Sequence, residues 1–366
     1  MLQNKTVLIT GGTGSFGSSL VRLLITFNPK EIRILSRNFE KQQSLKSEIE
    51  ERIDAIGNRN TESLRGLKFV SGDISDKSIV NEAVKGCDII FHTAALKDVS
   101  YCEQHPLEAL EVNVYGTNNL IESAIEHRVK KVVVVSTDKA VAPAGTMGIT
   151  KAMMERVVLA KSSEIENQDI ENLKITLPST SFVIIRFGNL MGSSGTVVPL
   201  FIKQVKEGKK LTVTNPQMTR FMMTLSQAAE YALFALEKGN DGDIIIRNSP
   251  ALSIGNLARA VIELYGKNLK NEESDSTSQI IVTGSRPGER LFEIMASEQE
   301  MLKAEQIEDS IYLRIPAFKS PGNLSGSDTT SETKLSVPDN VTQPKELNSS
   351  NIGELNIEEI KSLIKK

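Results

Sequence analysis

The feature that most constrains the fold is a series of short, β-branched runs that alternate with longer amphipathic stretches through the first half of the chain. Strands that are apolar almost throughout are typical of a parallel sheet covered by helices on both faces. The sequence therefore predicts an α/β fold with a doubly wound parallel sheet in residues 1–190. The runs read "KTVLIT", "IRIL", "LKFV", "DIIFH", "KVVVVS" and "FVIIRF".

After residue 190 the pattern loosens into shorter elements such as "LTVTN", "DIIIRN", "IGNLARAVIELYG" and "QIIVTG". We assign residues 191–318 mainly to a smaller substrate-binding lobe, some of whose elements return to the first domain. Residues 319–350 are rich in Ser, Thr, Asn and Pro and contain too few apolar residues for a core, which predicts a mobile segment. Residues 351–366 include "LNIEEIKSLIKK", whose apolar residues share one face of a predicted terminal helix.

The composition indicates a soluble globular protein of the cytoplasm. Hydrophobic residues make up 39% of the 366 residues, and 43 Lys and Arg against 46 Asp and Glu leave a net charge of -3. This balance does not favour nucleic-acid binding, and no apolar run reaches the roughly 18 residues of a membrane span. Two cysteines form no disulfide framework, and His92, His105 and His127 lack metal-ligand spacing, so we predict no metal.

A glycine-rich turn follows the first predicted strand. Gly12, Gly14 and Gly17 give the G-x-G-x-x-G spacing, and Gly11 gives an overlapping one. Glycines at these positions let the backbone approach a pyrophosphate, and the following helix supplies free N–H groups. The motif predicts a dinucleotide site, with a glycine-rich turn that binds no ligand as the alternative.

The end of the second strand indicates which dinucleotide is preferred. Ser36 and Arg37 stand where an NAD-binding protein usually carries a carboxylate for the ribose 2′-hydroxyl. Because a guanidinium can pair with a 2′-phosphate, NADP is favoured over NAD, although a solvated arginine at a strand end is an alternative. Asp73 follows the third strand and could accept from the adenine amino group or cap a turn.

The stretch "STDKAVAPAGTMGITK" follows the fifth strand, where open α/β sheets bind ligands. Asp138 and Lys139 offer an acid and a base side by side, and Lys151 lies one helical turn after Met147. Each residue also has a non-catalytic interpretation. Asp138 could cap the loop, Lys139 could be solvated, Lys151 could be exposed on the helix, and Met147 could pack in the core.

These motifs together resemble the extended short-chain dehydrogenase/reductase family, and within it the inverting UDP-N-acetylglucosamine 4,6-dehydratases of bacterial surface-polysaccharide synthesis. The resemblance covers about residues 4–315 and is greatest to the soluble capsular type of the UDP-N-acetyl-L-fucosamine pathway, because Met147 replaces the usual tyrosine. It is carried by "SFG", "SRNFEKQ", "GDI", "FHTAALKDV", "CEQHPLEALEVNVYGTNNLIESA", "STDKAV", "RFGNLMGSSGTVVPLF", "MTRFMM" and "RPGER".

The resemblance implies a set of roles for residues of this chain. Asp138 and Lys139 would relay protons, with a neutral Lys139 as base. Because Met147 offers no phenol, our own hypothesis is that Thr137 orients the C4 hydroxyl of the sugar and that Lys139, directly or through water, takes part in its deprotonation. The cofactor NADP would lie against Gly11, Gly14, Ser15, Phe16, Gly17, Ser36, Arg37, Asp73, Ile74, Ala94, Ala95 and Lys151. The substrate UDP-N-acetylglucosamine would contact Lys97, Asn189, Val198, Arg220 and Arg286.

The resemblance also implies a homo-oligomer, a hexamer by analogy with the relatives. Two other functions compete with the dehydratase. A UDP-sugar 4-epimerase also oxidises C4 but loses no water, and a non-catalytic NADP-binding sensor would keep only the dinucleotide fold. The sequence does not decide whether C3 is epimerised as well.

Overall fold

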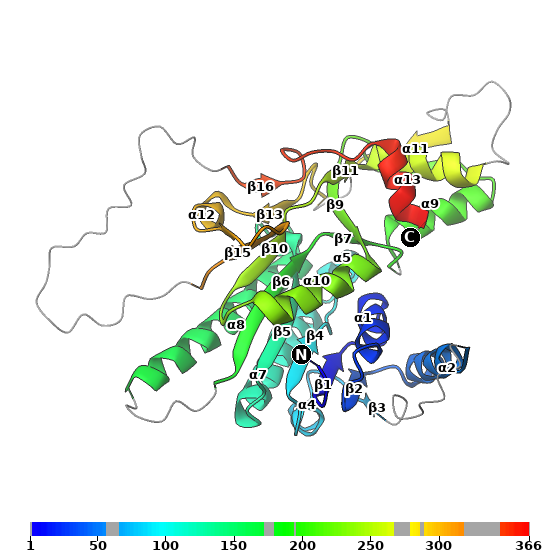
Figure 1. Cartoon of the computed structure of the whole chain (residues 1–366). Helices are drawn as coiled ribbons and strands as arrows, with labels where there is room; N and C mark the ends of the chain where they lie inside the picture. The colour runs from blue at the N-terminus through cyan, green and yellow to red at the C-terminus, as the bar shows by residue number, and fades with distance from the viewer. Residues whose placement is uncertain are drawn as a thin grey trace, which may run out of the picture.

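The computed structural model describes residues 2–55, 66–171, 179–193, 195–266, 279–285, 289–317 and 345–365. Its centre is a nine-stranded sheet with the order β14-β15-β10-β6-β5-β4-β1-β2-β3 (Figure 1). The strands from β10 to β3 are parallel, and β15 and β14 extend the sheet in antiparallel pairs. Their bounds are β1 (Thr6–Thr10), β2 (Glu31–Ser36), β3 (Leu67–Ser71), β4 (Ile89–His92), β5 (Lys131–Thr137), β6 (Ser181–Phe187), β10 (Ile244–Arg247), β14 (Glu305–Gln306) and β15 (Tyr312–Ile315).

Helices cover both faces of this sheet (Figure 1). One apolar cluster joins the sheet to α1 (Ser15–Ile25), α2 (Phe39–Ala55) and α10 (Leu225–Lys238). A second cluster joins the other face to α4 (Lys77–Val84), α7 (Gly116–Glu126) and α8 (Thr146–Glu171). The predicted doubly wound fold is confirmed. The remaining short helices of this half are α5 (Val99–Gln104), α6 (Pro106–Leu110), the π-helix η1 (Glu111–Tyr115) and the 3₁₀-helix η2 (Asp138–Ala140).

A smaller lobe lies beyond the carboxyl edge of the sheet. It contains a sheet of order β11-β9-β7 and the pair β12-β8, packed on α9 and α11 around a third apolar cluster. The terminal helix α13 lies on α11 and α9 and contributes the fully buried Ile360. The bounds are β7 (Asn189–Met191), α9 (Val197–Lys206), β8 (Leu211–Val213), β9 (Thr219–Thr224), β11 (Ala251–Ser253), α11 (Ile254–Tyr265), β12 (Ile280–Val282) and α13 (Ile357–Lys365).

Two segments differ from the sequence-based prediction. The run "DIIIRN" forms β10 in the main sheet rather than an element of the smaller lobe, because three consecutive isoleucines are buried there on both faces. Residues 345–350, assigned above to a mobile segment, form a turn and β16 (Leu347–Asn348), which pairs with β13 (Ile294–Ala296). The side chains of Asn348 and Ser349 are buried there and make hydrogen bonds inside the fold. Residues 318–344 of that segment lie outside the described part.

One further short helix, α12 (Glu298–Met301), follows β13 and begins with a capping box at Ser297. Among the described residues, no helix has the length and apolar character needed to cross a bilayer.

Candidate active site

The glycine-rich turn joins β1 to α1 at the carboxyl edge of the sheet. Gly11 has φ 68°, and a Cβ atom there would lie 2.8 Å from the Cα atom of Ala94, so the approach of β1 to β4 requires glycine. A Cβ on Gly17 would collide with the carbonyl oxygen of Gly11. Gly14 is the N-cap of α1 and makes no side-chain cap, so the first N–H groups of α1 face the turn. This cradle fits a dinucleotide pyrophosphate.

Other residues predicted to contact the cofactor lie around this turn. Ser15 begins α1, whereas the ring of Phe16 packs edge-on against that of Phe187, with 5.0 Å between the ring centroids. Ser36 is buried at the end of β2 and accepts from Gln42 Nε2 at 3.0 Å. Ile74 belongs to the apolar core, and Ala94 and Ala95 follow β4.

Arg37 and Asp73 face each other across the ends of β2 and β3. Their side chains approach to 3.3 Å, and that of Arg37 is 57% exposed. Asp73 also accepts from the backbone and hydroxyl of Ser75, as a turn-capping aspartate does. Burial alone would raise the pKa of Asp73, but the hydrogen bonds from Ser75 and the charge of Arg37 outweigh it and lower the pKa. Arg37 thus lies at the cofactor edge with half of its side chain open to a ligand.

Asp138 and Lys139 begin η2 directly after β5. Lys139 Nζ donates to Asp138 Oδ1 at 3.0 Å, and Thr137 Oγ1 donates to the same oxygen at 3.0 Å. The Asp138 side chain is fully buried, and its second oxygen, Oδ2, has no hydrogen-bond partner within the described residues. A buried carboxylate oxygen without a donor is costly in a finished core, so this oxygen indicates a place for a ligand.

Glu293, which the sequence analysis did not select, completes this cluster. Its carboxylate lies 3.3 Å from Lys139 Nζ and 3.5 Å from Arg220 Nε, and the residue is buried at the start of β13. A lone glutamate in the apolar run "LFEIM" was the only sequence signal for it. The residues it contacts come from η2 and β9, which no local pattern connects.

The sequence predicted a neutral Lys139, but its neighbours favour the protonated form. Burial alone would lower the pKa of Lys139, but the charges of Asp138 and Glu293 outweigh burial and raise it above the ordinary value. Lys139 is therefore an ammonium held between two carboxylates. In this state it can give a proton but cannot take one.

Lys151 has a different environment on α8. Its Nζ donates to the carbonyl of Val135 at 2.7 Å and contacts Met154 Sδ at 3.2 Å. Burial lowers the pKa of Lys151 to about 8, and the more distant charge of Glu155 opposes this only in part. Lys151 Nζ thus lies against β5 near the carboxyl end of that strand, next to the edge where the cofactor is expected.

Met147 is a packing residue in this structure. It is 7% exposed and lies in a small apolar cluster with Cys102 and Ala109. The core interpretation therefore describes Met147 better than the catalytic one, because a thioether there has apolar neighbours and accepts no proton.

A buried ion network fixes the floor of the site. Ser136 Oγ donates to Glu155 Oε1 at 2.5 Å, and Arg186 binds both Glu155 and Glu300 with pairs of hydrogen bonds. Arg186 also donates to the carbonyl of Met295 at 3.1 Å. Since Met295 lies in β13, the network ties the strand that follows Glu293 to β6 and α8.

The residues predicted to contact substrate divide into two groups. Lys97 Nζ donates to Ser193 Oγ at 2.9 Å, and the side-chain oxygen of Asn189 is buried with no partner among the described residues. Asn189 begins β7 and Ser193 follows it, so Asn189 and Lys97 lie at opposite ends of this short strand and remain candidates for the pyrophosphate. Arg220 instead joins the Lys139 cluster, where its guanidinium donates to the carbonyls of Thr219, Arg290 and Leu291. Arg286 lies outside the described residues.

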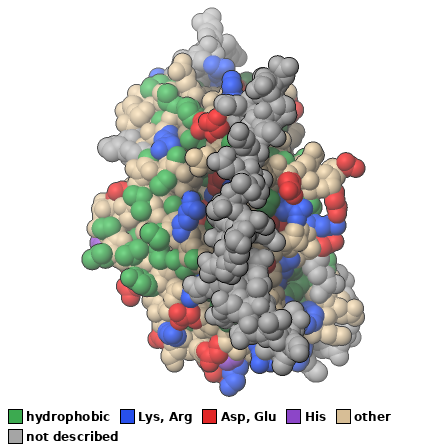
Figure 2. Space-filling model, turned by 90° about the vertical axis from the view of Figure 1, so that its left-hand side faces the viewer, with side chains coloured by type: hydrophobic (Ala, Val, Ile, Leu, Met, Phe, Trp, Pro, Cys, Tyr) green, Lys and Arg blue, Asp and Glu red, His purple; other side chains and the backbone are tan. Residues whose placement is uncertain are grey.

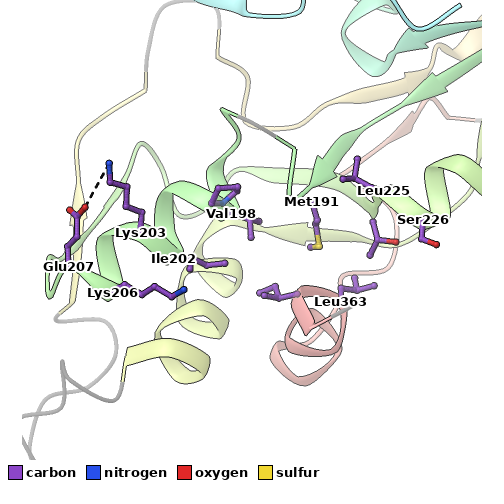
Figure 3. A pocket seen from close by; sticks show the side chains of 13 residues that line it. Met191, Val198, Ile202, Lys203, Lys206, Glu207, Leu225, Ser226 and Leu363 are labelled. Carbon is purple, nitrogen blue, oxygen red and sulfur yellow. Dashed lines mark ion pairs between the residues drawn. The ribbon is translucent and has the colours of Figure 1, made fainter. Parts of the chain in front are cut away.

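Val198 lies apart from the proton-transfer cluster. It lines a largely apolar cavity of about 690 Å³ between α9, the end of β7, the start of α10 and α13 (Figure 3). Lys203 and Glu207 form an ion pair at 3.8 Å at one end of this cavity. The lining includes neither Arg220 nor Lys139.

The histidines and cysteines have structural surroundings. His92 is buried between the hydroxyls of Thr10 and Thr117, at 2.8 and 2.9 Å, and burial lowers its pKa to about 3. Within the described ranges, no three side chains of His, Cys, Asp or Glu gather as a metal site would require.

The chain has the Rossmann-like parallel-sheet fold of extended short-chain dehydrogenase/reductase structures. The sequence matches the profile of the polysaccharide biosynthesis protein family over residues 7–315, and the chain belongs to that family.

Similar proteins carry names from both activities. The chain is 39% identical over 368 residues to a protein named UDP-glucose 4-epimerase from Rickettsia canadensis, covering 100% of this chain and 96% of the relative. The crystal structure of Pen from Bacillus thuringiensis superposes with a TM-score of 0.80 at 32% identity, covering 100% and 98% of the two chains. DesIV from Streptomyces venezuelae, a dTDP-glucose 4,6-dehydratase solved with NAD bound, gives 0.63 at 22% identity over 78% and 86%, a likeness of fold.

Proposed function

We propose that this chain is an inverting UDP-N-acetylglucosamine 4,6-dehydratase with tightly bound NADP, a lyase of surface-polysaccharide synthesis in the cytoplasm. The observation that carries the proposal is the buried cluster of Asp138, Lys139 and Glu293, in which two carboxylates flank one ammonium. A 4-epimerase moves only the proton of the C4 hydroxyl away and back. A dehydratase must take two protons, from O4 and C5, and return two, to the departing C6 hydroxyl and to C5.

The cluster of Asp138, Lys139 and Glu293 contains groups that can serve in these proton transfers. The free oxygen of Asp138 accepts the C5 proton, and the ammonium of Lys139 protonates the C6 hydroxyl, which leaves as water. A bound nicotinamide would accept the hydride from C4 and return it to C6. Delivery of a solvent-derived proton to C5 from the opposite face then inverts that carbon, and the protons taken up by Asp138 and Lys151 balance those given by Lys139 and solvent. The net change is the loss of one water, and the product is a 4-keto-6-deoxy-L-hexosamine nucleotide.

The proton of the C4 hydroxyl needs a separate acceptor, because Met147 cannot act as one. The sequence analysis placed Lys139 in this role, but its two carboxylates keep it protonated. Lys151, whose pKa is about 8, is the amine closer to neutrality, and Thr137 orients the hydroxyl. Single-turnover reduction of NADP by the Lys139→Ala variant tests this, since a full rate of C4 oxidation leaves Lys139 outside the first step.

The cofactor proposal rests on the glycine cradle and on Arg37. The cradle fits a pyrophosphate, and a half-exposed guanidinium at the end of β2 fits a 2′-phosphate better than a 2′-hydroxyl. The relative DesIV was solved with NAD, so comparing the affinities for NADP and NAD is a direct test.

A UDP-sugar 4-epimerase is the second candidate, because curated relatives 39% identical to this chain carry that kind of name. A non-catalytic sensor is less well supported, because it would have no need of an ammonium between two buried carboxylates at the cofactor edge.

Homo-oligomer formation is part of the proposal. Apolar side chains gather along the left flank of the face drawn in Figure 2. The contacting helices α5, α6, η1 and α8 expose six large apolar side chains, a density that suits a subunit interface. They are Val99, Tyr101, Leu107, Tyr115, Ile149 and Met153.

Incubation with UDP-N-acetylglucosamine in deuterated water separates the candidates. We expect a product that has lost one water and carries deuterium at C5, read by mass spectrometry and NMR. An intact hexose epimerised at C4 would replace the dehydratase with the epimerase. The heat-denatured protein is the matched control.

A further inference from the structure

The C-terminal strap, defined as residues 346–351, runs directly along the strand that carries Glu293. The backbone N–H of Ser349 donates to the carbonyl of Glu293 at 2.9 Å, and the N–H of Glu293 donates to Ser349 Oγ at 3.0 Å. Ser349 is 2% exposed. One side chain from the far end of the chain thus holds the backbone of a residue that faces Lys139.

The same hydroxyl reaches a second strand of the site. Ser349 Oγ lies 2.8 Å from Thr219 Oγ1 and 3.0 Å from the carbonyl of Thr219. Thr219 precedes Arg220, whose Nε lies 3.5 Å from Glu293. Ser349 therefore joins β9, which carries Arg220, to Glu293 directly before β13, and these are the charged neighbours of Lys139 from outside η2.

The strap is rigid enough to act as a fixed support. Asn348 Oδ1 accepts from the backbone N–H groups of Ser350 and Asn351, at 2.9 and 3.0 Å, which closes the turn. Further along, Leu355 N donates to the carbonyl of Ala251 at 2.8 Å, and α13 is anchored by its buried face. Hydrogen bonds within the turn and the docked helix that follows it therefore hold Ser349 in place.

We propose that Ser349 is a positioning residue of this enzyme, which fixes the Glu293 carboxylate against the Lys139 ammonium and so makes the C-terminal strap part of the active site. The proposal deepens the proposed function and rests on it for the role of Lys139 as proton donor. The charged groups that face Lys139 are Asp138, Glu293 and Arg220.

The proposal predicts a pH effect with a definite sign. The carboxylates of Asp138 and Glu293 raise the pKa of Lys139, so a displaced Glu293 would support the ammonium less and lower that pKa. Lys139 would then lose its proton at lower pH, and the basic limb of the kcat profile would move to lower pH. A general loss of structure would reduce activity equally at every pH.

The test compares three variants of the full chain. Ser349→Ala removes the hydroxyl, Ser349→Thr keeps it, and Ser44→Ala removes an exposed serine hydroxyl on α2, outside the strap. We expect Ser349→Ala to lower kcat about tenfold with little change in KM, because small displacements of catalytic groups cost this much or more. Its basic limb should move to lower pH, while the other two variants keep the wild-type limb.

A second readout does not depend on the reaction. Trace acetylation over a pH series, read by mass spectrometry, reports the pKa of Lys139 against that of Lys203, whose side chain is 73% exposed. We expect Ser349→Ala to label Lys139 at lower pH than the wild type and to leave Lys203 unchanged. If the wild type removes no water but this labelling shift appears, the dehydratase proposal fails and the positioning role stands.

The proposal is overturned if Ser349→Ala has the melting temperature, pH profile and Lys139 labelling of the wild type, or if Ser349→Thr shifts as much as the alanine variant. Should Ser349→Ala not fold, Thr219→Val removes the other hydroxyl of the pair. The same labelling shift is then expected, and its absence rejects the proposal.

Discussion

The surroundings of Lys139 and Lys151 differ in a way that burial alone does not explain. Lys151 is 7% exposed, and its pKa falls to about 8. Burial acts to lower the pKa of Lys139 as well, yet that pKa is raised. The difference lies in the partners, because Lys139 has two carboxylates within 3.3 Å, whereas Lys151 donates to a backbone carbonyl.

The site therefore contains two lysine amines whose pKa values are shifted in opposite directions. Lys139 keeps its proton and suits the role of an acid, whereas Lys151 gives its proton up more easily and suits a role beside the cofactor. This division accounts for a site that has a lysine but no tyrosine at the start of α8. Substitution of the two lysines by the same residue tests the division.

The largest difference should appear in catalysis. Lys139→Met should reduce the formation of dehydrated product about 10³-fold, the usual range for loss of a general acid or base. Dinucleotide affinity should stay unchanged in this variant and fall about tenfold in Lys151→Met, because Lys151 lies at the cofactor edge. Single-turnover product analysis and dinucleotide titration measure the two effects. Lys151→Met should also lose product formation, because Lys151 is the proposed acceptor of the C4 hydroxyl proton, so an equal change of dinucleotide affinity in the two variants is the result that would contradict the division.

The next effect is on stability, where the two substitutions should have opposite signs. Lys151→Met removes a buried charge and should raise the free energy of unfolding at pH 7 by roughly 2–3 kcal/mol. Lys139→Met leaves Asp138 and Glu293 without their cation and should lower it by roughly 2 kcal/mol. Urea unfolding at pH 7 measures both free energies of unfolding. If the two substitutions changed stability in the same direction, the proposed difference between the lysines would be wrong.

The pH dependence of these stability differences sharpens the test. Lys151 binds its proton more weakly in the folded than in the unfolded state, so the wild type is penalised fully below pH 8. The advantage of Lys151→Met should therefore shrink above pH 8 and vanish near the unfolded value of 10.5. For Lys139 the raised pKa means that the loss should persist up to about pH 10.5. Unfolding at pH 7, 8, 9 and 10 separates the two courses.

The smallest expected effect lies at the other end of the cofactor. Arg37→Ala should weaken NADP binding about tenfold and leave NAD binding nearly unchanged, because only the 2′-phosphate pairs with the guanidinium. Titration with both dinucleotides measures this. Equal weakening of the two would assign Arg37 to the support of Asp73 instead.

Local sequence patterns predicted the features that depend on residues close together in the chain. The six strand runs of the first domain and the glycine turn follow from residue types a few positions apart, and the structure places them as expected. The sequence also located Asp138, Lys139 and Lys151 at one edge of the sheet, since β5 delivers the first two and α8 the third. The run "DIIIRN" was misassigned because an apolar strand does not reveal which sheet it joins.

The parts that sequence reasoning missed depend on contacts between distant segments. Glu293, Glu155 and Ser349 each matter through a partner on another element, and their own neighbours in the chain give little sign of it. The polar composition of residues 345–350 suggested solvent, yet inside the fold these side chains bond to each other and to β13.

By itself the sequence determined the sheet, the cradle for a dinucleotide and the chemical groups available at its edge, because these follow from periodicity, glycine spacing and residue type. The tertiary structure alone decided that Lys139 is charged and that Met147 is packing, because a pKa and a packing role are set by neighbours. Those neighbours come from β13, α5 and α6, and only folding brings them to η2 and α8.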